Sequence, residues 1–238
     1  MRLLIFSLVI LISSMSYSQG LFEYFKLTAD DDGPEKFDRI AVDINWDSWL
    51  GAPSDIKTGN YSIGVNAYWY KDIPLNKKST IAFAFGLGFS SHNVHHNGQL
   101  LNLDSAGNNF TGLYPLAQGV TWKKNKFTAN YFDVPIELRF RNMYIQPKNS
   151  DANFKKFRIY PGFKFGVMVN NHTKWRDDNI KYKVYNLKNV LKYRYGATVR
   201  VAFNKIAFSA FYSLSPLFEK NKGQEMYPIS IGISWIRF

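Results

Sequence analysis

An alternation with a period of two residues runs through much of this chain and restricts what the chain can fold into. In residues 227–238, Ile229, Ile231, Ile233 and Trp235 fall on one face, and mostly small or polar residues fall on the other. A period of two indicates a β-strand, because successive side chains of a strand point to opposite sides of the backbone. The segment is therefore predicted to be a strand.

Seven earlier segments alternate in the same way: 38–49, 61–71, 80–90, 131–142, 157–170, 191–202 and 206–214. Short connections follow the second and sixth segments, whereas the loops at 91–130 and 171–190 are long. The connection at 143–156 is an exception, because it is long for a periplasmic turn. Short turns at one end and long loops at the other are typical of a barrel that crosses a membrane. The fold class predicted is all-β: an eight-stranded antiparallel transmembrane β-barrel of up-and-down topology.

The ionisable residues of these segments fall almost entirely on the face opposite the large apolar residues. A soluble sandwich would turn such charges to water, whereas a membrane barrel turns its apolar face to lipid and its charges to the lumen. An eight-stranded barrel is only wide enough for its own inward side chains, so we expect a plugged, ion-paired lumen. The expected lumen residues are Asp43, Asp47, Asp133, Glu137, Arg139, Arg141, Arg158, Lys164, Lys192, Arg194 and Arg200. Two interpretations stay open: structural pairs, or the lining of a narrow ion path or anion site.

The first residues have the pattern of a signal for export. Arg2 precedes an apolar run at 3–12, and small residues at 16 and 18 suggest cleavage before Gln19. We therefore expect a signal peptide at 1–18, a turn-rich periplasmic lead-in at 19–36 and a barrel domain at 37–238. The chain has no cysteine, which excludes disulfides and thiolate metal sites.

The chain is basic and rich in aromatic residues. Its formal net charge is +12 and 17% of its residues are aromatic, which suits the interfaces of a membrane barrel. Because the sequence is exported and shows no clustered basic stripe, nucleic acid is not expected as a partner. The expected partners are outer-membrane lipids and lipopolysaccharide, together with the barrel-insertion machinery. The expected location is the cell outer membrane.

Two segments also resemble a known family. Residues 131–140, YFDVPIELRF, resemble a strand of the Bacteroidetes outer-membrane β-barrel proteins called the PorT-like family, and residues 229–238 resemble its terminus. The resemblance implies an outer-membrane barrel of a Gram-negative bacterium and no catalytic residues. Trp235 and Phe238 would be the insertion signal. The chain has two residues between them where the family usually has one, so we expect a bulge or a frayed end there.

Candidate chemistry is sparse. His92, His95 and His96 are close enough in sequence to suggest zinc or copper, but their spacing matches no standard signature and no cofactor or metal is expected. Ser90 with His92 and a carboxylate from Asp47, Asp104 or Asp133 is the pattern that a lipid hydrolase would use. No catalytic residue is assigned on this basis, and an enzyme is not expected.

Aromatic and basic residues gather in the second long loop, around 170–185, in a composition suited to binding glycan or protein. The sequence therefore favours an envelope structural or interaction protein that acts through its extracellular loops, with an envelope protein complex as a further candidate partner. The alternatives are a narrow pore for ions or small solutes and an outer-membrane lipid hydrolase.

Overall fold

The computed structural model describes residues 40–76, 80–105, 108–141, 157–203 and 205–237. The chain divides into two units, Met1–Lys36 and Phe37–Phe238, and all the described strands belong to the second. The proposed signal peptide, the lead-in and Phe238 lie outside the described residues. Within the described ranges, no helix has the length and apolar character needed to cross a membrane.

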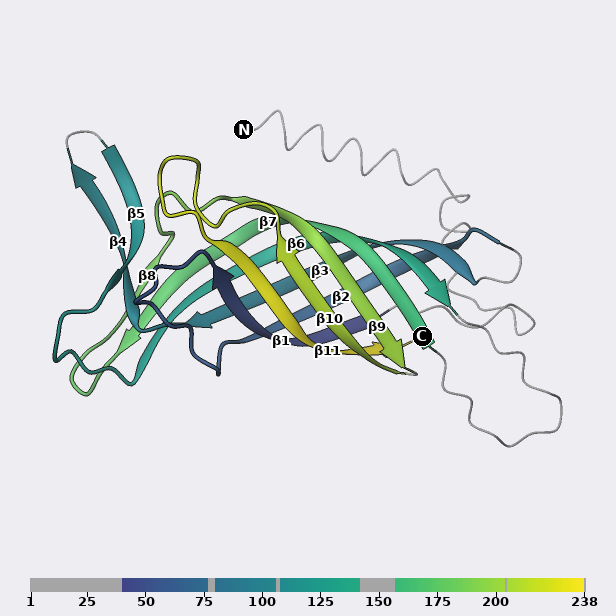
Figure 1. The fold of residues 1–238 in the computed structure, drawn as a ribbon, viewed down its shortest axis with the longest axis horizontal. Helices are drawn as coiled ribbons and strands as arrows, with labels where there is room; N and C mark the ends of the chain where they lie inside the picture. Colours follow the sequence, from purple (N-terminus) through teal and green to yellow (C-terminus); the bar gives the residue numbers. More distant parts are fainter. Residues whose placement is uncertain (1–39, 77–79, 106–107, 142–156, 204, 238) are drawn as a thin grey trace, which may run out of the picture. The chain divides into compact units, whose positions relative to one another are not determined.

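The described residues contain eleven strands. They are β1 (Ile40–Leu50), β2 (Ile63–Pro74), β3 (Ile81–His95), β4 (Gly98–Ser105), β5 (Asn108–Pro115), β6 (Lys124–Arg141), β7 (Phe157–Arg176), β8 (Lys181–Tyr185), β9 (Tyr193–Phe203), β10 (Ile206–Ser213) and β11 (Tyr227–Arg237). Eight of them form the barrel in the order β6-β3-β2-β1-β11-β10-β9-β7, and pairing of β6 with β7 closes the ring (Figure 1). The predicted closed, antiparallel, eight-stranded barrel is confirmed.

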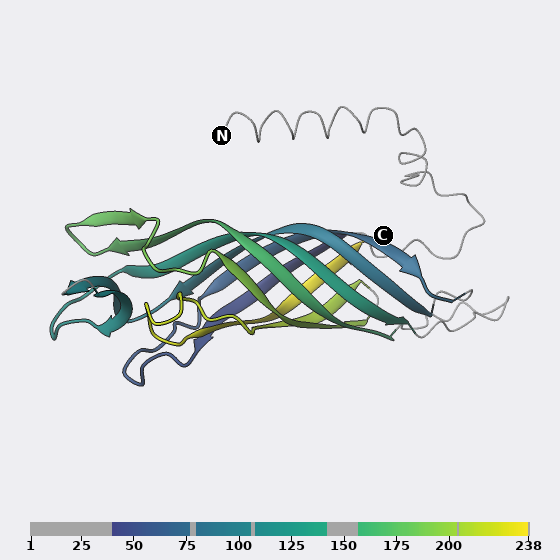
Figure 2. The same cartoon turned by 90° about the horizontal axis from the view of Figure 1, so that it is seen from above.

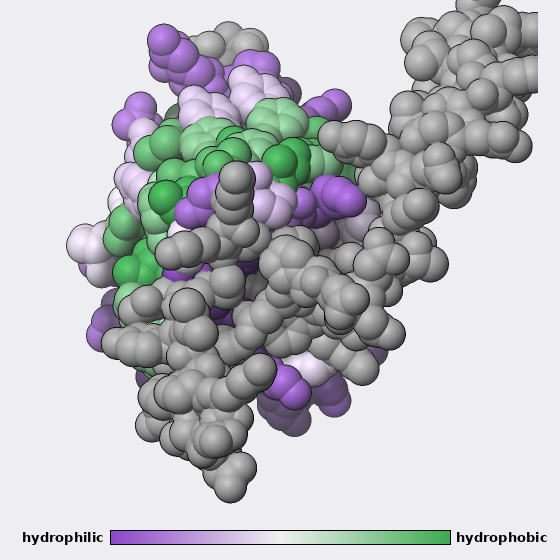
Figure 3. Space-filling view, turned by 90° about the vertical axis from the view of Figure 1, so that its right-hand side faces the viewer, coloured by the Kyte–Doolittle hydropathy of each residue, from purple (hydrophilic) through white to green (hydrophobic). Residues whose placement is uncertain are grey.

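Alternation fixes which side chains meet lipid. Along β6, Phe132, Val134, Ile136, Leu138 and Phe140 are exposed on the outside, and the residues between them are buried in the lumen. The same division holds on the other barrel strands, and we call this outer zone the apolar belt. Figure 3 looks at the end of the barrel where the C terminus lies and shows apolar residues gathered on the outer wall. Burial of this belt in lipid is favourable because it removes apolar surface from water.

Narrow packing explains the small residues of β3. Gly88 lies opposite Tyr68, and Gly86 lies opposite Tyr70, with both tyrosine rings inside the barrel. A Cβ added at either glycine would collide with the neighbouring tyrosine ring and with a backbone carbonyl of β2. Side chains of the neighbouring strand β2 therefore fill the space over these glycines.

Several strands run further than the alternation predicted. β3 continues to His95, β6 begins at Lys124 and β7 continues to Arg176, all in regions that we expected to be loops. Above the apolar belt both faces of these strands are largely polar or buried, so the apolar–polar period fades although the backbone pairing continues. Within the same regions the structure adds the β4–β5 hairpin and β8, which pairs with β7.

Among the described residues, the long connections lie at one end of the barrel, opposite the end at which β11 finishes (Figures 1 and 2). Because long loops are extracellular in bacterial barrels, we call this the extracellular end. The long connection expected at 143–156 lies outside the described residues. The bulge or frayed end that we expected in the last strand does not occur in its described part. Ile236 pairs with Ala41 and Arg237 with Ile40 in unbroken register, so no bulge or fraying occurs up to Arg237. Trp235 faces out, while Ile236 turns inward and packs near Tyr160.

Candidate functional site

The lumen is filled by layers of paired charges, which begin near the periplasmic end. The guanidinium of Arg139 donates to Asp72 at 2.6 Å and lies 2.8 Å from a carboxylate oxygen of Glu137. Its central carbon lies 4.9 Å from the centre of the Tyr160 ring, so the cation is held by two carboxylates and an aromatic face. Arg141 also pairs with Asp72. This layer neutralises two arginines with two acidic side chains.

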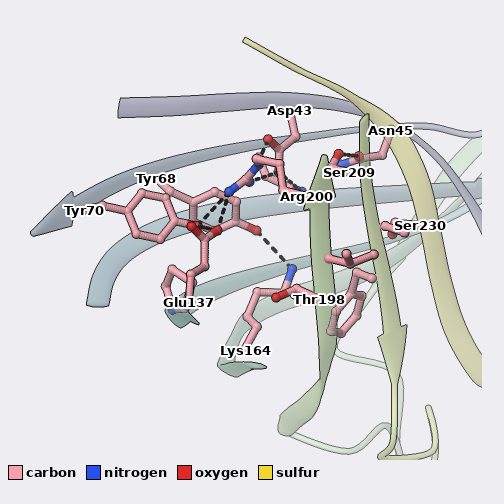
Figure 4. A pocket seen from close by; sticks show the side chains of 15 residues that line it. Asp43, Asn45, Tyr68, Tyr70, Glu137, Lys164, Thr198, Arg200, Ser209 and Ser230 are labelled. Atoms are coloured by element: carbon pink, nitrogen blue, oxygen red, sulfur yellow. Dashed lines mark hydrogen bonds and ion pairs between the residues drawn. The ribbon is translucent and has the colours of Figure 1, made fainter. Parts of the chain in front are cut away.

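Arg200 forms the middle layer (Figure 4). It lies between Asp43, whose oxygens are 3.2 and 3.3 Å from its Nη2, and Glu137, with which it makes a second ion pair. The hydroxyl of Tyr70 donates to Glu137 at 2.8 Å, and that of Ser234 donates to Asp43 at 2.6 Å. A cavity of about 20 Å³ borders this layer, which is room for about one water molecule.

Asp133 forms the upper layer and is completely buried. It receives two hydrogen bonds from Arg194, at 3.0 and 2.9 Å, and a hydrogen bond from Ser90. The ammonium of Lys164 lies 3.6 Å from the same carboxylate and donates to the hydroxyl of Tyr68 at 3.0 Å. Asp133 is therefore the shared counter-charge of two buried cations, Arg194 and Lys164.

Above Asp133, polar contacts centre on Asp47. This carboxylate accepts from the hydroxyl of Ser230 at 2.7 Å and from the backbone N–H of Asn93 at 3.2 Å. Its other contact is Nδ1 of His92, at 3.0 Å. The Nε2 of His92 is buried without a hydrogen-bond partner, beside a second cavity of about 20 Å³.

Ten of the eleven expected lumen residues thus lie in the barrel interior or at its inner rim. Arg158 is buried on β7. Lys192 is the exception, because β9 begins at Tyr193 and the Lys192 side chain is exposed. The prediction for Lys192 was wrong because we extended the alternation beyond the end of strand pairing. Trp235, the described half of the expected insertion signal, lies on the outer surface.

Sequence reasoning missed an apolar cap over the extracellular end of the lumen. Its buried members come from inward strand ends and from the loops between them: Trp49, Ile56, Val94, Leu113, Phe127, Ala129, Tyr131, Val190, Leu217, Phe218 and Met226. Hydrogen bonds join these loops, among them two between Gln224 and the backbone of Leu113. The inward apolar residues Val94 and Phe127 were the available signal, since they interrupt the charged lumen face.

A groove of about 450 Å³ lies beside this cap, between β4 and the strands β6, β7 and β8. Its walls include Leu101 from β4 and Trp175, Tyr182 and Val184 from β7 and β8. The side chains of Leu101, Tyr182 and Val184 are exposed. His96 also lines the groove, and burial lowers the pKa of its imidazole to about 4, so the ring is neutral at pH 7.

The structure does not bring together the Ser–His–carboxylate group or the three histidines that the sequence suggested. Ser90 hydrogen-bonds to Asp133 and Tyr68, whereas His92 contacts Asp47. His95 packs against Tyr61 at a ring separation of 4.6 Å, away from His92 in the lumen. Among the described residues, no group of three His, Cys, Asp or Glu side chains is placed to hold a metal ion.

Comparison with known proteins gives one result. Residues 37–219 match a family model described as outer membrane protein beta-barrel domain. The match covers seven of the barrel strands and ends before β11, whose pairing with β1 and β10 completes the ring. No curated protein matches the chain.

Proposed function

The chain belongs to the outer membrane protein β-barrel domain family, and on this premise we propose that it is a plugged barrel that anchors an extracellular recognition surface for another envelope protein. Its location is the outer membrane. The proposal rests on the contrast between the filled lumen and the groove at the extracellular end of the barrel. Layers of buried ion pairs and an apolar cap fill the lumen, whereas the groove at the extracellular end has a volume of about 450 Å³.

The filled lumen argues against the narrow pore. Each interior cavity beside Arg200 and His92 has room for about one water molecule. A conducting path would require several buried pairs to separate at once, and breaking one such pair costs about 3–5 kcal/mol. We expect the purified protein to give no steady conductance in planar bilayers. Steady single-channel currents at low protein load would contradict the plugged barrel.

The groove has the composition of a protein-binding surface. Exposed apolar and aromatic side chains, including Tyr182, Val184 and Leu101, gather in one concave place. Large exposed apolar surfaces mark interaction sites, and tyrosine and tryptophan are enriched in them. β8 is the last strand of its sheet, so part of its backbone hydrogen-bonding capacity points away from β7. An extended segment of a partner protein fits such an edge by adding a strand.

Photo-crosslinking in native envelopes tests this partner. A crosslinking residue at Tyr182 should capture one partner in a stoichiometric amount, and a crosslinking residue at Lys220 in the β10–β11 connection serves as the control. Adding Val184→Asp should reduce the capture at least tenfold, because it places a charge in the apolar contact. Equal capture from both positions, or capture unchanged by Val184→Asp, would contradict a groove-bound partner.

The finer family assignment belongs to the same proposal. We infer a member of the PorT-like family from a Bacteroidetes, exported by the signal peptide at 1–18 and acting without catalysis. The resemblance of residues 131–140 to a strand of that family supports this assignment. In the barrel, the polar residues of this segment make ion pairs in the lumen: Asp133 with Arg194, and Glu137 with Arg139 and Arg200. N-terminal sequencing of the mature protein tests the export signal, with Gln19 as the expected first residue.

A further inference from the structure

Basic side chains line the outward face of β6, β7 and β8 beyond the apolar belt. The strand register places them in two rows of three, Lys126 with Lys174 and Lys183, then Lys124 with Arg176 and Lys181. The rows are two residues apart on every strand, so all six side chains share one face. We call these six residues the basic ladder.

The ladder faces away from the lumen. On β6 the buried residues Asn125 and Phe127 point inward, so Lys124 and Lys126 point outward, on the same side as Phe132 of the apolar belt. The transition is marked by Asn130, which donates a 2.7 Å hydrogen bond to Asn170 on the neighbouring strand. The ladder is therefore the polar continuation of the surface that faces lipid.

Its height above the belt restricts the partner. Lys126 is six residues beyond Phe132, which is about 20 Å along a strand and about 15 Å along the membrane normal at the usual tilt. The headgroup layer of a phospholipid extends only about 5–8 Å beyond the hydrocarbon core. Ordinary phospholipid headgroups lie mostly below the ladder, whereas the saccharide part of an outer-leaflet glycolipid extends to its level.

The six cations receive little compensation from the protein. Among the described residues, none of the six makes an ion pair with a carboxylate. The two acidic residues that follow Arg176 in the chain have other partners: Asp178 pairs with Lys123, and Asp177 accepts from the backbone N–H groups of Asn179 and Ile180. Like charges directly opposite each other on neighbouring strands are destabilising.

The local electrostatics agree with this geometry. Lys126 lies above the membrane-spanning part of β6, and partial burial together with the neighbouring lysines 124, 174 and 183 lowers its pKa to about 8. Its ammonium group donates a hydrogen bond to the amide oxygen of Asn93, which is uncharged. A bound anion would relieve this repulsion.

We propose that the basic ladder binds the anionic saccharide core of an outer-leaflet glycolipid, through phosphate or carboxylate groups on its sugars. The acyl chains of the same molecule would then pack on the apolar belt below, so that one lipid contacts both zones. Lys174 also borders the groove, whereas the other five ladder residues do not line it. The site does not depend on a protein partner in the groove.

The test compares glycolipid binding by the folded barrel in detergent and by two matched variants. The first carries Lys124→Gln, Lys174→Gln and Lys183→Gln, and the control carries Lys57→Gln, Lys205→Gln and Lys220→Gln. The three control lysines are exposed and lie in connections outside β6, β7 and β8. The probes are lipopolysaccharide with a complete core, lipid A without core sugars, and phosphatidylglycerol. Heat-dependent migration in gels checks that each variant is folded.

We expect the ladder variant to bind complete lipopolysaccharide at least tenfold more weakly than the wild type, since each basic group near an anionic surface contributes measurably to affinity. The control variant and a Lys→Arg version of the ladder should bind like the wild type. Lipid A and phosphatidylglycerol should bind wild type and ladder variant equally. Equal loss in the control, or a wild-type preference for lipid A over the complete glycolipid, would overturn the proposal.

Discussion

Replacement of Asp133 by Asn should be among the most destabilising single changes in the barrel. Asp133 is completely buried and is the carboxylate partner of both Arg194, at 2.9–3.0 Å, and Lys164, at 3.6 Å. Asparagine keeps the size of the side chain but removes its charge, so two buried cations lose their counter-charge. Removing one member of a buried pair typically costs about 3–5 kcal/mol, and the second cation places the expected loss at the upper end.

Urea titration of the protein in lipid vesicles, followed by tryptophan fluorescence and by the heat-dependent gel shift, measures this loss. Asp104→Asn is the matched control, because Asp104 is exposed and its replacement should change the free energy of unfolding by less than about 0.5 kcal/mol. Arg194→Met in the Asp133→Asn background should recover part of the loss, since the cycle then removes both partners. A loss below about 1 kcal/mol for Asp133→Asn would refute the account of the lumen as an obligatory charge network.

Three further predictions follow from the packing, the correction at β9 and the outer loops. Gly88→Val should lower the free energy of unfolding by about 1–3 kcal/mol or more in the same assay, because a side chain there meets the Tyr68 ring and the backbone of β2; an unchanged midpoint would show that the lumen has unfilled room. Lys192→Ala should change the free energy of unfolding by less than about 0.5 kcal/mol because that side chain is exposed, whereas Lys164→Ala should change it clearly, since Lys164 is buried beside a carboxylate. The pKa of the exposed Asp177 is lowered, first by hydrogen bonds from the N–H groups of Ile180 and Asn179. A depressed carboxyl pKa stabilises the loop above the unfolded value near 4 and loses that effect as pH falls through the lower folded value. Amide exchange at Ile180 should therefore quicken, relative to an amide in β1, as pH falls below the unfolded value near 4, and a constant ratio would contradict the assignment.

Much of the barrel was predictable because one physical rule acts on each strand separately. In the apolar belt, every second residue meets lipid and the others meet the lumen, so local alternation reports the global environment. The strand β6 shows this directly. Asp133, Glu137 and Arg139 lie inside, and the alternate residues lie outside, as expected: Phe132, Val134, Ile136, Leu138 and Phe140. The sequence also named most members of the lumen network, although it included Lys192 in error and missed Asp72, which lies one residue beyond the second predicted segment.

The partners within the network were not predictable. Arg200 and Asp43 are 157 residues apart, and their contact depends on barrel closure and on strand register. The same holds for the apolar cap, whose members come from several loops. Above the belt, both faces of a strand meet water or protein, so apolar and polar residues no longer alternate. The extensions of β3, β6 and β7 were therefore predicted to be loops.

The sequence by itself determined the barrel architecture, the lipid-facing residues and most of the inward charges, because these follow from period-two patterning. Only the tertiary structure decided which charges meet. The basic ladder is the clearest case, because the sequence shows no clustered basic stripe, yet lysines from around 124, 174 and 181 form one face. Strand pairing brings residues distant in the chain to about 5 Å from each other, and that proximity makes three short basic stretches a single surface.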